Sequence, residues 1–318
     1  MEPAEVTSAT VARLYRRFLT TDRKLVETFG DPFRPLEPEC KVVQFDRPLK
    51  PTELQNAGEI MRGRPDVELY VYGIASRDLD FLGYFEGLRR LHLALYELED
   101  VAGFFHLQGG LEELTFGQTR RKFSLRFLAT LPRLTRLFLA KHTKDLAAIQ
   151  TLSRLDKLGL SGITLPDLAL IEPLTQLREL SILLGGIRNL QLLPRLSELE
   201  RLFLMRITKI SDLGVLADLE GLRSLRLDWM RNVTSLPSFS RLSRLEAVEL
   251  DTMKGLTDLS PVAAAPALRR LTITAMPQLS AESFRCLIGH PRLAELWAYT
   301  GRQTVNDAVK QMFPGIAR

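Results

Sequence analysis

Hydrophobic positions along the chain recur in one short pattern, in which leucine or another apolar residue fills the first, fourth and sixth of six positions. The alternation in the second half of the pattern has the period of two that indicates a short strand with one buried face. The pattern starts at ten leucines spaced 21 to 25 residues apart: Leu88, Leu111, Leu134, Leu155, Leu177, Leu199, Leu222, Leu245, Leu268 and Leu293. We therefore predict one strand in each of ten successive repeats.

A second apolar pattern precedes each strand. Apolar residues lie six and three positions before the leading leucine, as Leu128 and Leu131 do before Leu134. A spacing of three suits a tight helical or 3₁₀ return segment that buries one edge. No repeat can bury both of its apolar edges alone, so the repeats must stack and their strands must form a parallel sheet.

These repeats resemble the leucine-rich repeat family, in the short-repeat form typified by bacterial internalins, from about residue 66 to residue 300. The resemblance implies an α/β solenoid or horseshoe, with a curved parallel β-sheet on its concave face and short helical or 3₁₀ returns on its convex face. One feature departs from the family. The family usually has asparagine three residues after the last strand leucine, where this chain has apolar residues such as Ile207, Met230, Met253 and Met276.

A solenoid exposes its core at both ends and needs atypical segments to cover it. We divide the chain into an N-terminal helical cap with an irregular first unit (1–66), about ten to eleven leucine-rich repeats (67–300) and a C-terminal helical cap (301–318). Within these segments we predict a helix from Thr7 to about Phe29, a strand from Lys41 to Phe45, a helix from about Thr52 to Met61, a degenerate strand from Val67 to Val71 and a closing helix from Val305 to Phe313.

The composition is that of an ordinary soluble protein. Hydrophobic residues make up 45% and charged residues 25% of the 318 positions, and no apolar run approaches the roughly 20 residues that span a bilayer. The first residues lack the pattern of a secretory signal, so we expect a cytoplasmic protein. Cys40 and Cys286 are too few for a disulfide framework, and we expect both to be buried as small hydrophobic residues.

The net charge is +5 and the isoelectric point about 9.3, which raises the question of a nucleic-acid partner. Of the 43 basic residues 33 are arginine, a bias that we attribute to a GC-rich genome. The one compact basic run, Arg120 to Lys122, is interpreted as a solvated loop. The strand positions that should face the concave surface hold eight Lys or Arg against six Asp or Glu, and this mixture argues against nucleic acid there.

Enzymatic chemistry has little support in the sequence. The four histidines (His92, His106, His142 and His290) fall in different repeats without metal-ligand spacing. No phosphate loop, zinc-binding or nucleophile motif is present. We therefore predict a protein that is not an enzyme, with no metal and no cofactor.

The side chains that should face the concave surface predict a binding site in the middle and late repeats. They include an apolar cluster formed by Phe138, Leu183, Leu184, Phe203, Met205 and Trp229. Beside it lie Asp228 and Asp251, expected about 4.8 Å apart on adjacent strands with Arg226 only partly compensating. A partner would supply an apolar anchor and a Lys or Arg. The alternative is that the apolar side chains pack on one another or under a loop. The candidate partner-binding residues are Phe138, Leu183, Phe203, Met205, Arg206, Arg226, Asp228, Trp229, Glu249, Asp251, Trp297 and Tyr299.

The expected function is a non-enzymatic protein–protein interaction through the concave face, as an inhibitor, scaffold or bacterial effector, by a monomer or weak oligomer. The alternative is binding of nucleic acid or another anionic surface through the convex side. The return segments there carry Arg154, Arg195, Arg241 and Arg244. A steep loss of binding with salt would favour this alternative.

Overall fold

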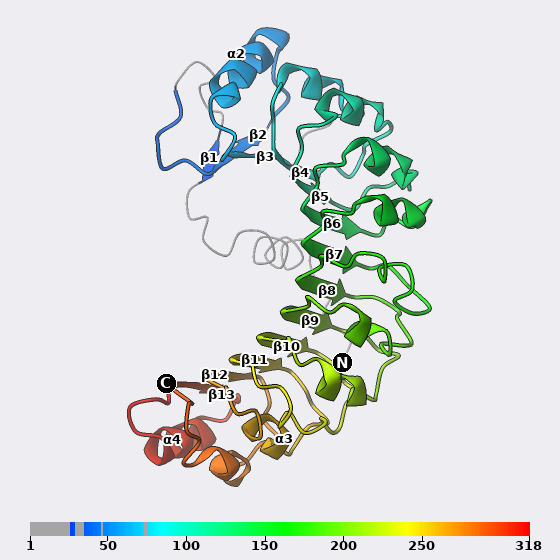
Figure 1. The fold of residues 1–318 in the computed structure, drawn as a ribbon. Helices are drawn as coiled ribbons and strands as arrows, with labels where there is room; N and C mark the ends of the chain where they lie inside the picture. The colour runs from blue at the N-terminus through cyan, green and yellow to red at the C-terminus, as the bar shows by residue number, and fades with distance from the viewer. Residues whose placement is uncertain (1–25, 29–34, 46, 73–75) are drawn as a thin grey trace. The chain divides into compact units, whose positions relative to one another are not determined.

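The computed structural model describes residues 26–28, 35–45, 47–72 and 76–318. The chain forms two compact units, residues 1–121 and 122–318, which we call the first and the second unit. Within each unit the strands follow one another in chain order and pair in parallel. Figure 1 shows this succession, with every strand followed by a return segment.

The described part of the first unit confirms three of the predicted elements and corrects a fourth. Strand β2, helix α2 and strand β3 match the strand, helix and degenerate strand predicted before the first regular repeat. Val26–Thr28, however, is a strand that pairs with β2, so the helix predicted to reach Phe29 is wrong there. Pairing with a neighbouring strand outweighs the helical periodicity of this segment. The remainder of that predicted helix lies outside the described residues. The elements are β1 (Val26–Thr28), β2 (Val42–Phe45), α2 (Pro51–Arg62), β3 (Glu68–Tyr72), η1 (Asp80–Tyr84), β4 (Arg90–Ala94), η2 (Ala102–Leu107) and β5 (Glu113–Phe116).

The described residues of the second unit form eight strands joined by 3₁₀ helices, short α-helices or turns. Each strand begins two residues after a leading leucine, as predicted for all ten repeats. The elements are η3 (Leu125–Thr130), β6 (Arg136–Ala140), η4 (Leu146–Thr151), β7 (Lys157–Ser161), β8 (Glu179–Leu183), η5 (Leu193–Arg195), β9 (Arg201–Met205), η6 (Gly214–Asp218), β10 (Ser224–Asp228), β11 (Ala247–Asp251), α3 (Ser260–Ala263), β12 (Arg270–Thr274), η7 (Ala281–Leu287), β13 (Glu295–Tyr299) and α4 (Gln303–Met312).

The leucines of the repeat form a continuous core between strands and returns. In the β9 repeat, Leu202 and Leu204 point inward from the strand, and Leu213, Leu216 and Leu219 point inward from the return. All five are at most 5% exposed. The spacing of two in the strand and three in the return therefore buries two facing edges, as the sequence predicts.

Each strand from β6 to β12 is followed by a residue in the left-handed backbone conformation. These residues have φ between 50° and 63° and are Lys141, Gly162, Leu184, Arg206, Trp229, Thr252 and Ala275. Their N–H groups donate to the carbonyl of the next strand, as Trp229 does to Asp251 at 2.9 Å. The conformation costs a non-glycine residue about 1–2 kcal/mol. It turns the chain so that the following side chain, such as Met230 or Met253, enters the core.

That following position is where the related repeats usually carry asparagine. Here the structure buries Ile207, Met230, Met253 and Met276 at this position, and a polar side chain from the same turn bonds the backbone in two repeats. Asn232 donates to the Thr208 carbonyl at 2.7 Å, and Gln278 donates to the Met253 and Leu256 carbonyls at 2.7 and 2.8 Å. These amides join consecutive repeats from a different position of the turn.

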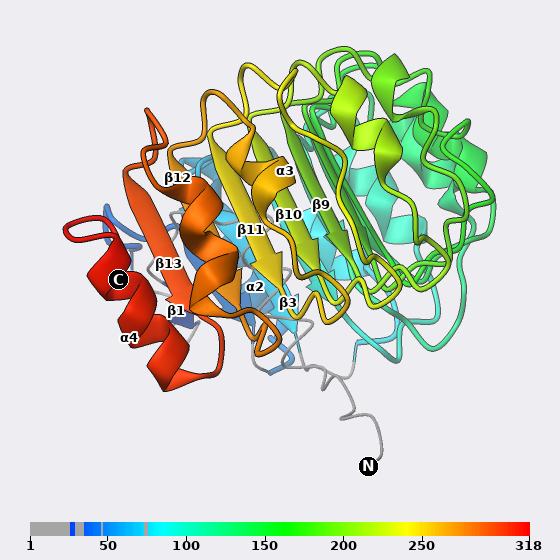
Figure 2. The same cartoon turned by 90° about the horizontal axis from the view of Figure 1, so that it is seen from below.

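The C-terminal segment of the second unit packs along its last strand. Helix α4 lies beside β13 (Figure 2) and confirms the predicted closing helix. Its Val305 and Val309 are buried. Beyond it the chain pairs with β13, since Leu296 donates to the Ile316 carbonyl and Arg318 donates to the Leu296 carbonyl. An edge strand with unpaired backbone groups invites further pairing, and this tail occupies that edge. The division into caps at 1–66 and 301–318 around repeats at 67–300 stays a prediction.

Two expectations about composition meet different outcomes. None of the described helices has both the length and the apolar character that crossing a bilayer requires. Both cysteines are free thiols, and Cys40 is buried as expected. Cys286 is exposed, which corrects the prediction. With three residues per turn, η7 turns Phe284 and Leu287 inward and leaves Cys286 on its outer side.

Candidate functional site

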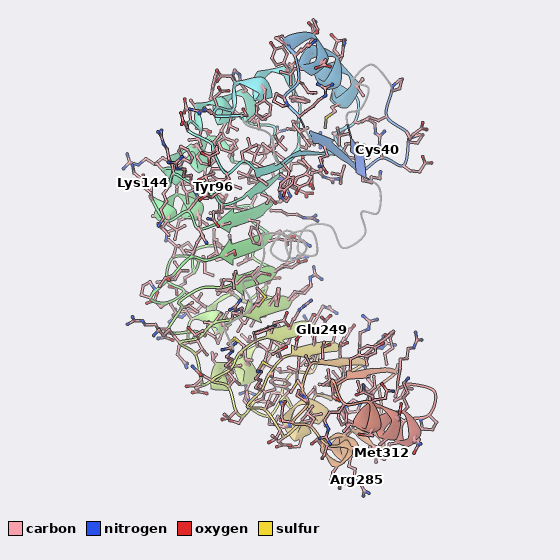
Figure 3. The ribbon with its side chains drawn as sticks, turned by 180° about the vertical axis from the view of Figure 1, so that it is seen from behind. Cys40, Tyr96, Lys144, Glu249, Arg285 and Met312 are labelled. Carbon is pink, nitrogen blue, oxygen red and sulfur yellow. The ribbon has the colours of Figure 1, made fainter. Side chains whose placement is uncertain are left out.

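The candidate site lies on the face of the second unit's sheet opposite the return segments. We call this surface the inner face, and it carries the third, fifth and seventh positions of each repeat. Figure 3 shows Glu249 of β11 on this face and Arg285 of η7 on the return side. Because the strands pair in parallel without slippage, equivalent positions form rows across the sheet, for example Arg201, Ser224 and Ala247.

The apolar cluster predicted on the inner face is not an exposed patch. Phe138, Leu183 and Met205 are 0%, 2% and 5% exposed, which corrects the expectation that they offer accessible surface. Leu183 and Met205 are register partners on β8 and β9. Strands lie only about 4.8 Å apart, so neighbouring side chains in one row cover each other, and burying apolar area is favourable. The packing alternative applies to Leu183 and Met205, whereas the register partner of the buried Phe138 on β7 is Gly159, which has no side chain to cover it.

Three of the four aromatic side chains that remain accessible, Phe203, Trp229 and Trp297, lie under arginines, and Tyr299 lies beside Trp297. Trp229 is 38% and Tyr299 49% exposed, while Phe203 and Trp297 are half-buried. The Arg226 guanidinium carbon lies 4.7 Å from the Phe203 ring centroid, and that of Arg318 lies 5.1 Å from the Trp297 ring. Trp229 has two such neighbours, Arg206 at 5.6 Å and Arg231 at 5.9 Å. Cation–π contacts of this kind hold the rings in place while leaving one side accessible.

Next to these rings lies a group of charges that we call the Asp228 cluster: Arg226, Asp228, Glu249 and Asp251. Arg226 donates to both Asp228 oxygens at 2.7 to 3.1 Å and lies 3.3 Å from a Glu249 oxygen. Asp228 and Asp251 are register partners on β10 and β11, as predicted. With all groups ionised, one positive and three negative charges give the cluster a net charge of −2.

The surroundings of Asp228 alter its acidity. Burial, together with the smaller effect of the charges of Asp251 and Glu249, raises the pKa of Asp228 to about 6 against the opposing effect of its hydrogen bond with Arg226. Burial lowers the pKa of Arg226, but the hydrogen bond to Asp228 and the neighbouring carboxylates hold it above its ordinary value. The cluster therefore holds more negative charge than its own arginine can balance.

A second group of charges on the inner face was not singled out from the sequence. Glu179 on β8 is the register partner of Lys157 on β7 and of Arg201 on β9, and its carboxylate forms an ion pair with each. We call these three residues the Glu179 ladder. The signal was present in the sequence, because the three residues share the third position of consecutive repeats and alternate in charge.

The histidines occupy separate places in the described structure. His290 has a structural role, because its ring bonds the Ala265 carbonyl at 2.9 Å and accepts from the N–H groups of Arg292 and Leu293. His142 is buried, and the His106 ring lies 4.1 Å from the Phe105 ring, tilted by 39°. His92 lies 3.8 Å from a Glu68 oxygen and against the Tyr70 ring, neighbours that the sequence did not assign to it.

Comparison with known proteins identifies this arrangement of strand and return. An internalin, InlF of Listeria monocytogenes, superimposes with a TM-score of 0.55 at 20% sequence identity, over 81% of this chain and 72% of that one. The chain has the leucine-rich repeat fold. Internalin C2 of the same species (TM-score 0.42, 21% identity, 71% of this chain and 84% of that one) is also similar. So is a leucine-rich repeat protein of Leptospira interrogans (TM-score 0.41, 14% identity, all of both chains).

These similarities concern the fold. No protein-family model matches the sequence, and no curated protein is significantly similar to it. A leucine-rich repeat sheet can carry many functions, so the function has to be argued from the particular side chains on the inner face.

Proposed function

We propose that this leucine-rich repeat protein is a non-enzymatic binding module that takes a protein partner on the inner face of the second unit. The observation that supports it best is the combination of accessible Trp229, Trp297 and Tyr299 with arginines over the two tryptophans. Trp, Tyr and Arg are the residues that contribute most to binding at protein interfaces. Their cation–π contacts preorganise the rings, which lowers the entropy lost on binding.

The Asp228 cluster supports a partner that brings a positive charge. Glu249 has a 41% exposed side chain, and Asp251 is half-buried beside it. The proposed contact is a Lys or Arg of the partner near these two carboxylates, with an apolar anchor against Trp229 and Phe203. Such a cation relieves the repulsion between Asp228 and Asp251, so binding gains from a strain already present. The proposed contact surface consists of Phe203, Arg206, Arg226, Trp229, Glu249, Asp251, Trp297 and Tyr299, and the buried Asp228 lies behind it.

Binding through the Arg-rich return side receives less support from the structure. Arg195 pairs with Glu172 at 3.4 Å, and Arg241 pairs with Asp218 and Glu220 at 3.0 and 2.7 Å. Of the four arginines named on the return side, Arg154 and Arg244 form no ion pair with a residue in the described ranges. Phosphate binding needs clustered cations whose charge is available. Acidic neighbours already offset part of that charge here.

We further propose that binding serves inhibition, scaffolding or an effector role. The protein is proposed to be cytoplasmic and to be a monomer or a weak oligomer. Both free thiols are consistent with a reducing compartment.

The test is affinity capture from native lysate with quantitative comparison of variants. The inner-face variant combines Phe203→Ala, Trp229→Ala and Asp251→Ala, and the control combines Arg154→Gln and Arg244→Gln on the return side. We expect one protein to be retained by the wild type and the control but lost by the inner-face variant, and to bind again when purified. Equal retention by all three, or loss only with the control, would contradict the proposal.

A further inference from the structure

Trp229 marks the point where the inner face meets the turn after β10, and two arginines flank it. Arg206 follows β9 and Arg231 follows Trp229 by two residues, with guanidinium carbons 5.6 and 5.9 Å from the ring centroid. We call these three residues the Trp229 edge. Arg206 and Trp229 have φ of 53° and 56°, so both side chains leave the sheet from the same kind of strand-ending position.

The two arginines of the Trp229 edge differ from those on the neighbouring strands. Arg201 pairs with Glu179, Arg226 with Asp228 and Glu249, and Arg270 with Glu295. Among the described residues, neither Arg206 nor Arg231 has a carboxylate within ion-pair distance. An accessible indole between two uncompensated guanidinium groups is a site for an anion with some apolar surface.

The Asp228 cluster determines which kind of anion fits. Asp228 directly precedes Trp229 in the chain, and its register partner Asp251 lies on the next strand. A continuous polyanion such as RNA would bring phosphates over a cluster of net charge −2, and that repulsion opposes it. A single carboxylate on a peptide avoids the repulsion, because a neighbouring residue of the same peptide can place a cation there.

The separation of the two charged regions sets the spacing on the ligand. Arg206 follows β9 and Asp251 ends β11, two strands away, and strands lie about 4.8 Å apart, so about 10 Å separates the rows. An extended peptide rises about 3.3 Å per residue, and three residues span that distance. The inner face therefore matches a peptide whose anion and cation lie three positions apart.

We propose that the occupant is an extended segment of a protein partner that crosses β9, β10 and β11, with an Asp or Glu carboxylate at the Trp229 edge. Three positions along, a Lys or Arg of the same segment pairs with Glu249 and Asp251. This inference rests on the proposed function, and it specifies the chemistry of the partner at that site. The two residues between the charges cross β10, whose Arg226 lies over the half-buried Phe203 ring.

The test uses full-length protein and fluorescent extended peptides of about ten residues, measured by fluorescence anisotropy at low salt. The mixed peptide carries glutamate and lysine three positions apart, and the others carry two glutamates or two lysines at those positions. We expect the mixed peptide to bind about tenfold more tightly than either of the others, because each of them loses one favourable charge pair and gains one unfavourable pair.

Variants of the protein should change this preference in opposite directions. Arg206→Gln with Arg231→Gln removes the preference for the mixed peptide over the two-lysine peptide. Glu249→Gln with Asp251→Asn removes its preference over the two-glutamate peptide. The return-side control, Arg154→Gln with Arg244→Gln, leaves all three affinities as in the wild type.

Three results would overturn the inference: equal affinity for the three peptides, no binding of any peptide, or tighter binding of a single-stranded RNA oligonucleotide that requires Arg206 and Arg231. These outcomes are distinguishable from failure of the proposed function. Capture of a protein that depends on Trp229 and Phe203 would still support inner-face binding even if no short peptide binds.

Discussion

Two groups of charges on the same sheet show how an ion pair that supports the fold differs from one that leaves charge available for recognition. In the Glu179 ladder, one buried carboxylate lies between Lys157 and Arg201 on the flanking strands. In the Asp228 cluster, one arginine faces three carboxylates, two of which are register partners. The first group satisfies its buried charge internally. The second keeps more negative than positive charge, and this difference is the physical reason for placing recognition at β10 and β11.

The largest expected effect comes from breaking the Glu179 ladder. Glu179→Gln removes the negative charge that pairs with Lys157, whose side chain is 15% exposed, and with Arg201, whose side chain is 49% exposed. We expect the free energy of unfolding to fall by about 3 kcal/mol, the loss typical of breaking a buried pair on one side. Urea denaturation at neutral pH measures it. Glu295→Gln, which disrupts the exposed pair with Arg270, should change the midpoint far less.

The second expected effect is a dependence of stability on pH that comes from Asp228. Its pKa is raised to about 6 in the fold, from an ordinary value of 3.8, so between pH 4 and pH 6 the folded protein binds more protons than the unfolded chain. The contribution of this carboxyl to stability is therefore largest at low pH and is lost as the pH rises through 6. A difference of about two pKa units corresponds to roughly 3 kcal/mol.

Comparison with Asp228→Asn isolates this contribution. The asparagine variant cannot titrate at this position, so its stability relative to the wild type should rise by roughly 2–3 kcal/mol between pH 4 and pH 7. Denaturation at several pH values measures the difference. A constant difference across this range would show that the Asp228 carboxyl has an ordinary acidity and that the cluster is not strained.

The smallest of the three effects has the opposite sign to that of Glu179→Gln. Asp251→Asn removes one of the two like charges in register, while its side-chain oxygen can still accept the hydrogen bond from Thr252, which is 2.5 Å long. We expect the free energy of unfolding at neutral pH to rise by up to about 1 kcal/mol. A substantial loss of stability would mean that Asp251 supports the fold, and the contrast between the two charge groups would disappear.

The repeat pattern predicts the fold in detail because the apolar residues recur every two positions in the strand and every three in the return. Each segment therefore has one apolar face that it can bury. The starting leucines locate β4 to β13, and the pairing of Asp228 with Asp251 follows from counting along two repeats. The strand at Val26–Thr28 could not be predicted in this way, because neither it nor its partner β2 carries the repeat pattern.

The exposure of side chains on the inner face was harder to predict than the face of the sheet to which each side chain points. Leu183 and Met205 lie in the predicted row, yet each is covered by the other, since lateral contact depends on the size of the neighbouring side chains. The positions of the arginines over Phe203, Trp229 and Trp297 could not be predicted from the pattern either, because a long flexible side chain can reach several rows. The Glu179 ladder, by contrast, follows from alternating charges in one row.

The most direct test of inner-face recognition separates binding from stability. The measurement is the dissociation constant, by calorimetry, of the purified partner for the wild type and for the double variant Glu249→Gln with Asp251→Asn. We predict that the double variant is at least as stable as the wild type but binds about tenfold or more weakly, because the partner's cation has lost its carboxylates. An unchanged dissociation constant in this stably folded variant would contradict the account.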